Sequence, residues 1–387
     1  MSRLKAYVSS AGMTPIADHW EDSILDLAVK AARGALKGST VKKPDQIIVG
    51  NMFSAVGARQ EHLGAMVATA LGLTGTPAYK VEAACSSGGT AFNVGYNLVR
   101  SGAIDSALVV GVEKMRDLEP EEVSRALAMA ESAEYTQFVG ATFAALNGLL
   151  ARYYMEQLDV SRDELSSIPV IDHANAVTAA HAQFRKAITP EVVGRSAMIA
   201  DPLRLFDCAP VGDGAAAVLL VNDNAVSGSK RRMAEVLGGR IATNDFSLYE
   251  REDMLDFKST RLAFKGAMGQ AGLAPSKLSL VELHDAFSVV GALSLEAMGF
   301  SKRGRGSKDA KAGKYDRSSD LPINTFGGLK ARGHPVGATG VYQIAEAYLQ
   351  LTDQAGKNQV EGADYAVTQN IGGVDTTAAV HVFGRAA

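Results

Sequence analysis

Five short apolar runs along the chain predict β-strands that are buried on both faces. They span residues 46–50, 106–112, 215–221, 278–283 and 365–369. Continuous apolar runs of this length, without strict alternation, are typical of strands that helices cover on both sides. Helical periodicity occurs between them, for example at 23–38 and 339–354. The pattern therefore predicts an α/β fold of layered sheets covered by helices.

The sequence also nearly repeats itself. "LAVKAARGAL" from Leu27 resembles "LAFKGAMGQAG" from Leu262, and "CSSGGT" from Cys85 aligns with "HPVGAT" from His334. Further along, "GAIDSALVVG" resembles "GADYAVTQN". Three matches in the same order favour a duplicated fold over chance similarity of Gly-rich turns. Equivalent helix starts would then present a cysteine in one half and a histidine in the other.

One segment interrupts this repeat. Residues 116–198 are rich in Ala, Glu and Met and include the long helical stretch "FAALNGLLARYYMEQL". The segment lies between two predicted core strands, which favours an insertion into the first half over a separate terminal domain. We expect a first half made of 1–115 and 199–230, an inserted loop domain at 116–198, and a second half at 231–387.

Composition narrows the class of protein. A chain of 387 residues can bury two or three cores, and its net charge of −3 argues against a general binder of nucleic acid or membrane surfaces. We see no signal peptide, no membrane-spanning stretch and no Cys/His cluster with zinc-ligand spacing. Two cysteines cannot build a disulfide framework, so we expect a cytoplasmic protein without a metal. The basic stretch 301–320 is interpreted as a solvated, flexible loop.

Cys85 lies among glycines and serines, in "KVEAACSSGGTAF" at 80–92. A thiol at a helix N-terminus beside a histidine has a lowered pKa, and a Gly-rich helix start offers backbone N–H groups to an oxyanion. The local sequence alone favours a buried, inert thiol. The matching His334 changes this interpretation, because its place between glycine and proline suits a fixed imidazole that can take a proton from a thiol.

Three other histidines are candidates for a functional role. His284, in "VELHDAFS", directly follows a predicted strand, and strand ends build sites in α/β folds. A structural histidine bonded to a backbone carbonyl is an equally good interpretation there. His173 and His181 belong to the inserted segment, where structural histidines are favoured over residues that line a substrate channel.

Together these motifs resemble the thiolase family over nearly the whole chain. The resemblance rests on the order and spacing of the Cys85 turn, "DGAAAV" (213–218), "HDAF" (284–287), "GGLKARGHPVGATG" (327–340) and "NIGG" (370–373). "HDAF" and "GLKARGHP" are most similar to archaeal-type acetoacetyl-CoA thiolases and the related sterol-carrier-type enzymes. The resemblance implies a five-layer αβαβα sandwich of two duplicated halves with an inserted loop domain.

The resemblance also implies roles for single residues. Cys85 would be the nucleophile that takes an acyl group, and His334 would activate it. With a water held by His284, His334 would stabilise the thioester oxygen of the second substrate. Backbone N–H groups of Cys85 and Gly372 would form the oxyanion hole. A coenzyme A thioester is the implied substrate, with candidate contacts at His173, His181, Gly333 and Gly337.

One residue departs from the family pattern. Many thiolases have a cysteine in a "CxG" motif near the C-terminus, which removes the α-proton during condensation, whereas this chain has Asn370. An amide cannot act as a proton base near neutral pH. His284 or His334 could take over that role. Acyl transfer to Cys85 is therefore better supported than carbon–carbon bond formation.

We expect an acetyl-CoA C-acetyltransferase that interconverts two acetyl-CoA with acetoacetyl-CoA and CoA. The alternatives are a thiolase-like acyltransferase with another acceptor, and a partner-dependent subunit of the lipid-transfer or aldolase kind. The presence of both Cys85 and His334 favours an enzyme. The resemblance further implies a homo-oligomer, dimer or tetramer, and allows a complex with a hydroxymethylglutaryl-CoA synthase and a zinc-ribbon/OB-fold protein in the mevalonate pathway.

Overall fold

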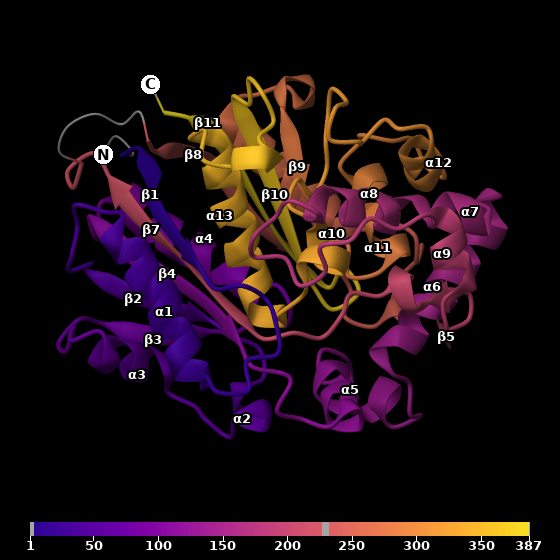
Figure 1. Ribbon diagram of the computed structural model, residues 1–387, viewed down its shortest axis with the longest axis horizontal. Coiled ribbons are helices and arrows are strands. Elements are labelled where there is room, and N and C mark those ends of the chain that lie inside the picture. The colour runs from indigo at the N-terminus through magenta and orange to yellow at the C-terminus, as the bar shows by residue number, and fades with distance from the viewer. Residues whose placement is uncertain (1–3, 227–231, 387) are drawn as a thin grey trace.

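The computed structural model describes residues 4–226 and 232–386. Nine strands form one sheet in the order β3-β2-β4-β7-β1-β8-β11-β10-β9 (Figure 1). They are β1 (Ala6–Met13), β2 (Gln46–Gly50), β3 (Ala78–Val81), β4 (Ser106–Glu113), β7 (Gly214–Asn222), β8 (Ala234–Thr243), β9 (Leu280–Glu282), β10 (Tyr365–Gly372) and β11 (Thr377–Arg385). All five strands expected from apolar runs are present.

The strand directions repeat between the two halves of the sheet. In the first half β2 is parallel to β4, β4 is antiparallel to β7, and β7 is antiparallel to β1. In the second half β9, β10, β11 and β8 follow the same succession of directions. The equivalent strands β1 and β8 pair with each other, at Tyr7–Glu235 and Val8–Ala234. The expected duplication is therefore confirmed.

Helices form three layers around these strands. The outer helices of the first half are α1 (Ile24–Lys37) and α3 (Leu63–Ala70), those between the halves are α4 (Ser87–Ser101) and α13 (Thr339–Leu351), and the outer ones of the second half are α10 (Lys258–Ala271) and α11 (Ser288–Ala297). Successive residues of β4 face different layers: Leu108 packs in the core with α1, and Val109 in the core with α4 and α13. The predicted αβαβα order is confirmed.

Helix α1 forms where its local sequence favours a helix. Ser23 accepts a hydrogen bond from the backbone N–H of Asp26 at 3.1 Å, and the Asp26 carboxylate accepts the N–H of Ser23 at 3.0 Å, which makes a capping box. Its buried residues Leu27, Ala31 and Ala35 recur at helical spacing and face the sheet.

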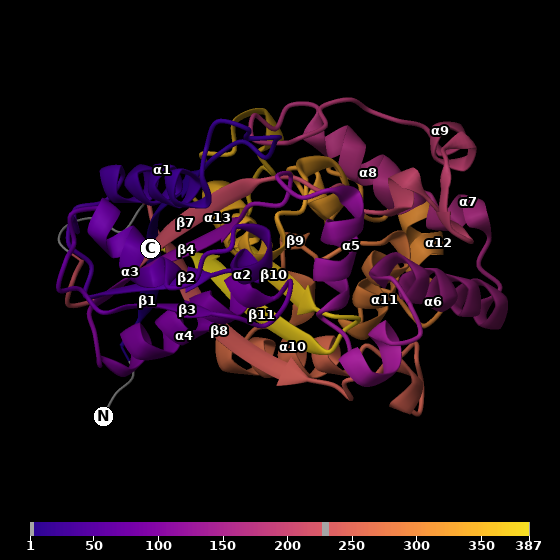
Figure 2. The same cartoon turned by 90° about the horizontal axis from the view of Figure 1, so that it is seen from below.

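The segment between β4 and β7 carries a series of helices. These are α5 (Pro120–Ala128), η1 (Ala133–Gln137), α6 (Phe143–Leu158), α7 (Arg162–Leu165), α8 (Ser167–Ala176) and α9 (Pro190–Arg195), followed by the small hairpin β5 (Met198–Ala200) and β6 (Leu203–Arg204). Of these helices, α5 packs near Phe53 and Cys85 of the first half, and α6, α7 and α8 pack on the second half. Figure 2 shows α6, α7 and α9 gathered at the end of the molecule away from β2 and β3, with α5 nearer the middle. Tyr154 and Ile168 share one apolar core with Leu293 of α11. The boundaries proposed for the inserted domain stay a prediction.

Short elements complete the fold. They are α2 (Ser54–Gly57), η2 (Leu205–Asp207), η3 (Leu248–Glu250), η4 (Pro275–Lys277), α12 (Gly306–Lys311), η5 (Gly328–Arg332), η6 (Val336–Ala338) and η7 (Gly356–Asn358). Within the described ranges, no helix combines the length and the apolar character needed to cross a membrane.

The expectation of a flexible loop at 301–320 was wrong. The segment contains α12, and Tyr315 is fully buried, with its hydroxyl 2.6 Å from that of Ser301. Asp309 forms ion pairs with Arg305 and Lys314, so part of the basic charge is neutralised inside the segment. Composition suggested a solvated loop because it does not reveal such local pairing.

Candidate active site

The turn that carries Cys85 joins β3 to α4 and has a fixed backbone. Ala84 has a φ of 50°, a left-handed conformation that is uncommon for a residue with a side chain. The Ser87 hydroxyl accepts the backbone N–H of Ala83 at 2.9 Å and donates to the carbonyl of Ala84 at 2.6 Å. These two bonds hold the turn, and Cys85 is left only 4% exposed.

The expected lowering of the Cys85 pKa was wrong. Burial raises the pKa of the thiol to about 12, and the carboxylates of Glu113 and Glu82 add to this effect. The start of α4 does not outweigh burial, because the thiolate would lie in an apolar cluster that includes Phe53 and Val336. Cys85 therefore rests as a thiol and needs a base to become a nucleophile.

Asn370, on β10, lies at the centre of the site. Its side-chain oxygen accepts the backbone N–H of Gly89 in α4 at 3.1 Å. Its amide nitrogen lies 3.1 Å from the carbonyl of Cys85 and 3.2 Å from Nδ1 of His284. The bond from Gly89 fixes which end of the amide is the oxygen, so the nitrogen donates to the other two partners.

His284 and His334 face each other. Their rings meet edge-on, with centroids 5.1 Å apart and planes at 83°. Both are buried, and burial lowers the pKa of His284 to about 3 and that of His334 well below its usual value. Both imidazoles are therefore neutral at physiological pH.

The hydrogen-bond partners give the two rings opposite tautomers. Asn370 donates to Nδ1 of His284, so the ring proton of His284 is on Nε2. Thr339 donates its hydroxyl proton to the carbonyl of Pro335 at 3.1 Å, so its oxygen accepts from Nδ1 of His334 at 2.7 Å. The lone pair of His334 is then on Nε2. The pair combines one proton donor, His284, with one proton acceptor, His334.

The two equivalent helix starts meet in the middle layer. A Cβ added to Gly88 would lie 2.8 Å from the carbonyl oxygen of Gly337, so only glycine allows this approach. Val336, two residues after His334, belongs to the same apolar cluster as Cys85. The turn of Cys85 and the turn of His334 thus lie side by side.

Gly372 packs its backbone against the Cys85 turn. A Cβ at this position would lie 2.3 Å from the carbonyl oxygen of Ala83 and 3.2 Å from Cβ of Ser86. The structure therefore brings together the five predicted catalytic residues: Cys85, His334, His284, Gly372 and Asn370.

Glu113 is a site residue that the sequence analysis missed. It is fully buried at the end of β4, where its carboxylate accepts the side-chain amide of Asn51 at 2.6 Å and the backbone N–H groups of Met52 and Gly337 at 2.8 and 3.0 Å. Burial raises its pKa to about 7 despite these donors. A carboxylate directly after a buried apolar strand, as in "SALVVGVE", was the signal that could have identified it.

The sequence analysis also missed two buried basic residues shortly before His334, Lys330 and Arg332. Lys330 forms an ion pair with Asp285 at 2.9 Å, and Arg332 one with Glu346 at 2.7 Å. Glu346 in turn contacts Nε2 of His181 at 2.7 Å. These ion pairs join η5, which ends two residues before His334, to α13 and to Asp285, the residue after His284.

The four candidate contacts for coenzyme A have other partners in the structure. His173 donates from Nδ1 to a backbone carbonyl 3.0 Å away. A Cβ on Gly333 would lie 2.6 Å from the side chain of Ile16, and Gly337 already donates its N–H to a carboxylate. These contacts, like that of His181, are structural, and a role of the four residues in binding coenzyme A stays a prediction.

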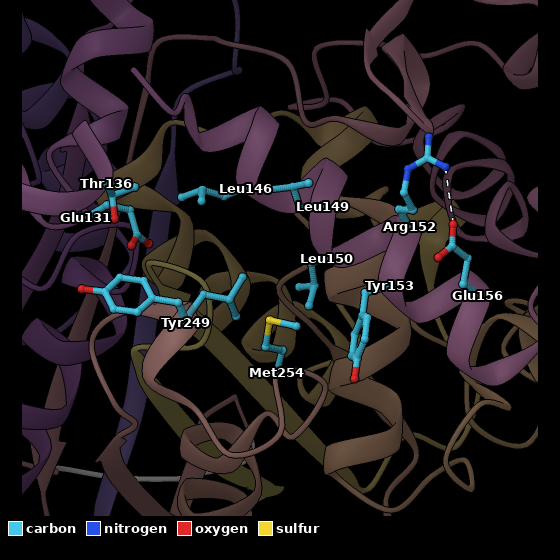
Figure 3. Close-up of a pocket in the computed structure, with 11 residues that line it drawn as sticks. Glu131, Thr136, Leu146, Leu149, Leu150, Arg152, Tyr153, Glu156, Tyr249 and Met254 are labelled. Atoms are coloured by element: carbon cyan, nitrogen blue, oxygen red, sulfur yellow. Dashed lines mark ion pairs between the residues drawn. The ribbon is translucent and has the colours of Figure 1, made fainter. Parts of the chain in front are cut away.

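An apolar pocket of about 400 Å³ opens between α6 and the segment after β8 (Figure 3). Leu146, Leu149 and Met254 line it, and Glu131 lies at one end. Burial raises the pKa of Glu131 to about 7, and the nearby backbone N–H of Val374 acts in the opposite direction. This end of the pocket therefore lies next to the turn that follows β10.

Comparison with known proteins agrees with this geometry. The model of the thiolase N-terminal domain matches residues 6–224, and that of the thiolase C-terminal domain-like family matches 241–385. An acetyl-CoA acetyltransferase of Methanothermobacter thermautotrophicus is 40% identical, over 98% of this chain and 99% of the relative. Sterol carrier protein 2 of Oryctolagus cuniculus is 30% identical, over 95% of this chain and 70% of the relative.

Solved structures share the fold at lower identity. The Ltp2-ChsH2(DUF35) aldolase superposes with a TM-score of 0.86 at 21% identity, covering 100% of this chain and 99% of that one. Human mitochondrial 3-ketoacyl-CoA thiolase in complex with CoA gives a TM-score of 0.75 at 20% identity, covering 99% of this chain and 98% of that one. With both family models matched in order along the chain, this protein belongs to the thiolase family.

Proposed function

We propose that the protein is an acetyl-CoA acetyltransferase that joins two acetyl-CoA into acetoacetyl-CoA and CoA, or runs the reverse thiolysis. The observation that carries this proposal is the pair of imidazoles with opposite tautomers. His284 is joined to the Cys85 turn through Asn370, and His334 lies two residues before Val336, which packs in the apolar cluster of Cys85. Support also comes from relatives of 40% and 35% identity over nearly the whole chain, both named acetyl-CoA acetyltransferase.

In this proposal each residue has one role in acyl transfer. Nε2 of His334 takes the proton of the Cys85 thiol, and the sulfur attacks the thioester carbonyl. Backbone N–H groups of Cys85 and Gly372 stabilise the oxyanion. His334 then protonates the leaving CoA sulfur. His284 donates from Nε2, directly or through a water, to the carbonyl oxygen of the second acetyl-CoA.

The proposal is tested with two cysteine variants. Cys85→Ala should abolish acetyl exchange between acetyl-CoA and labelled CoA, while circular dichroism shows an unchanged fold. Cys208→Ala is the matched control, because Cys208 is the other free thiol and also has a pKa raised to about 12. Near-normal exchange by the Cys85 variant would refute the mechanism.

We further propose a cytoplasmic homo-oligomer, a tetramer, that supplies the mevalonate pathway. The pairing of Ltp2 with ChsH2(DUF35) in the aldolase supports assembly of this chain with a second protein. We propose a zinc-ribbon/OB-fold protein and a hydroxymethylglutaryl-CoA synthase as partners. Light scattering of the purified chain, alone and with these candidates, tests the assembly. A monomer that binds neither would contradict it.

A further inference from the structure

The family pattern does not identify the base that removes the α-proton of the second acetyl-CoA, because this chain has Asn370 where many thiolases have a cysteine. The contacts of Asn370 exclude it from proton transfer. Its oxygen accepts from Gly89, and its nitrogen donates to Cys85 and to His284. A primary amide in these bonds has no basic lone pair to offer.

The nearby carboxylates are not available either. The oxygens of Glu113 already accept bonds from Asn51 and from two backbone N–H groups. Glu82 is exposed, and its carboxylate holds the backbone N–H of Ala84 at 2.5 Å. These are the two carboxylates whose charge acts on Cys85. Both carboxylates accept hydrogen bonds from backbone N–H groups and are therefore not placed to remove a proton from the substrate.

The two imidazoles differ in what Nε2 can do. Asn370 occupies the lone pair of His284 at Nδ1, so Nε2 of His284 carries a proton and can only donate. Nδ1 of His334 is bound to Thr339, so Nε2 of His334 carries the lone pair. His334 is also the more exposed residue, at 8% against 2% for His284. Its Nε2 is therefore the free base of this cluster.

We propose that His334 serves as the base in both half-reactions, a proposal that rests on the acetyltransferase function proposed above. Nε2 of His334 takes a proton from the methyl group of acetyl-CoA, and the electron pair of that C–H bond forms the enolate, whose oxygen accepts from His284. The enolate carbon attacks the acetyl carbon on Cys85 and the C–S bond breaks. The sulfur takes the proton from His334, which restores the thiol and the neutral ring.

The second role can be measured without the first. In the Cys85→Ala enzyme no acetyl-enzyme forms, so exchange of the acetyl-CoA methyl protons for deuterium in D₂O, followed by NMR, reports only the base. We expect exchange in this variant and at least a 100-fold loss on adding His334→Ala, with recovery by added imidazole. Adding His284→Ala instead should slow exchange without rescue by imidazole.

Three outcomes would overturn the proposal. They are exchange that survives His334→Ala, imidazole rescue of the His284→Ala enzyme, and no exchange at all without the sulfur of Cys85 while the wild type condenses acetyl-CoA. The last would make the Cys85 thiolate the base. Failure of the proposed function would look different, because the wild type would then not exchange acetyl groups with labelled CoA, whatever happens to the methyl protons.

Discussion

The carboxylate of Glu113 accepts the backbone N–H of Gly337 at 3.0 Å, and this bond joins the end of β4 to the turn after His334. The same carboxylate holds Asn51 and Met52 at the end of β2. One buried side chain thus fixes three segments. Each of them also contributes a neighbouring residue, Met115, Phe53 or Val336, to the apolar cluster of Cys85. Its negative charge also raises the pKa of the Cys85 thiol.

Glu113→Gln should separate these two effects. The amide keeps the shape but presents N–H groups toward Asn51 or Gly337, so we expect the free energy of unfolding to fall by about 1–3 kcal/mol. Removal of the charge should also lower the pKa of Cys85, seen as faster iodoacetamide labelling at a given pH. Labelling with an unchanged pH profile would show that the charge of Glu113 does not reach the sulfur.

Cys85 in the resting wild-type enzyme should react slowly. With its pKa raised to about 12, the thiolate fraction and hence the alkylation rate should rise about tenfold per pH unit between pH 7 and 9. Mass spectrometry of the labelled peptide measures this rate, and acetyl-CoA should protect the site. A rate that levels off below pH 8 would contradict the raised pKa.

Asn370→Asp should damage catalysis more than stability. A carboxylate cannot donate to Nδ1 of His284, so the ring proton should move to Nδ1 and Nε2 should lose its donor role. We expect kcat for condensation to fall by about 10²-fold, with little change in KM. Asn97→Asp, in the same helix as Gly89 but bonded to Asn93, is the control and should keep kcat.

Gly372→Ala should strongly reduce acetyl exchange. Its Cβ would lie 2.3 Å from the carbonyl oxygen of Ala83, so the turn of Cys85 must shift and the oxyanion donors with it. We expect a loss of acetyl exchange of about 10²–10³-fold. Gly269→Ala in α10 is the matched control: nothing lies within 4 Å of its Cβ, and it should raise the free energy of unfolding by about 0.5–1 kcal/mol. Equal activity of the two variants would remove Gly372 from the mechanism.

Burial of His381 should cause part of the loss of folding stability at low pH. Burial lowers its pKa to about 3, and its Nε2 lies 3.2 Å from the Asn93 amide. Because the unfolded chain binds this proton near pH 6.5 and the folded chain only near pH 3, the contribution of His381 to stability is lost as the pH falls between these values. His381→Gln keeps an acceptor for Asn93 but cannot take up this proton. As the pH falls, the free energy of unfolding of the variant should therefore decrease less steeply than that of the wild type, and the two slopes should differ by up to about 1.4 kcal/mol per pH unit. Identical slopes in urea titrations from pH 6 to 4 would contradict this.

Strands β2, β4, β7, β9 and β10 could be predicted from their apolar runs, whereas β1, β8 and β11 could not. Gly12 in β1 shows why: its Cβ would lie 2.3 Å from the backbone of Ala31 in α1. The equivalent Gly238 in β8 is as close to Ala267 in α10, at 2.2 Å. Close contact between a helix and a strand requires glycine there, and glycine breaks the apolar pattern by which a strand is predicted.

The sequence identified most residues of the candidate site but not the charges and pKa shifts within it. Motifs located Cys85, His284 and His334, because turns with glycine and polar residues stand out in sequence. The direction of the Cys85 pKa was wrong, since burial depends on side chains such as Phe53 that are distant along the chain. Glu113 was missed for a related reason: its partners come from two other segments, and only the fold brings them to it.

The pairing of equivalent strands β1 and β8 has a consequence for the chemistry. Two separate, identical chains associated in this way would place the same side chain on both sides of their symmetry axis, thiol opposite thiol or ring opposite ring. Joining the copies covalently frees positions 85 and 334 to differ. A nucleophile can then face its own proton acceptor, which no symmetric pair of identical turns could provide.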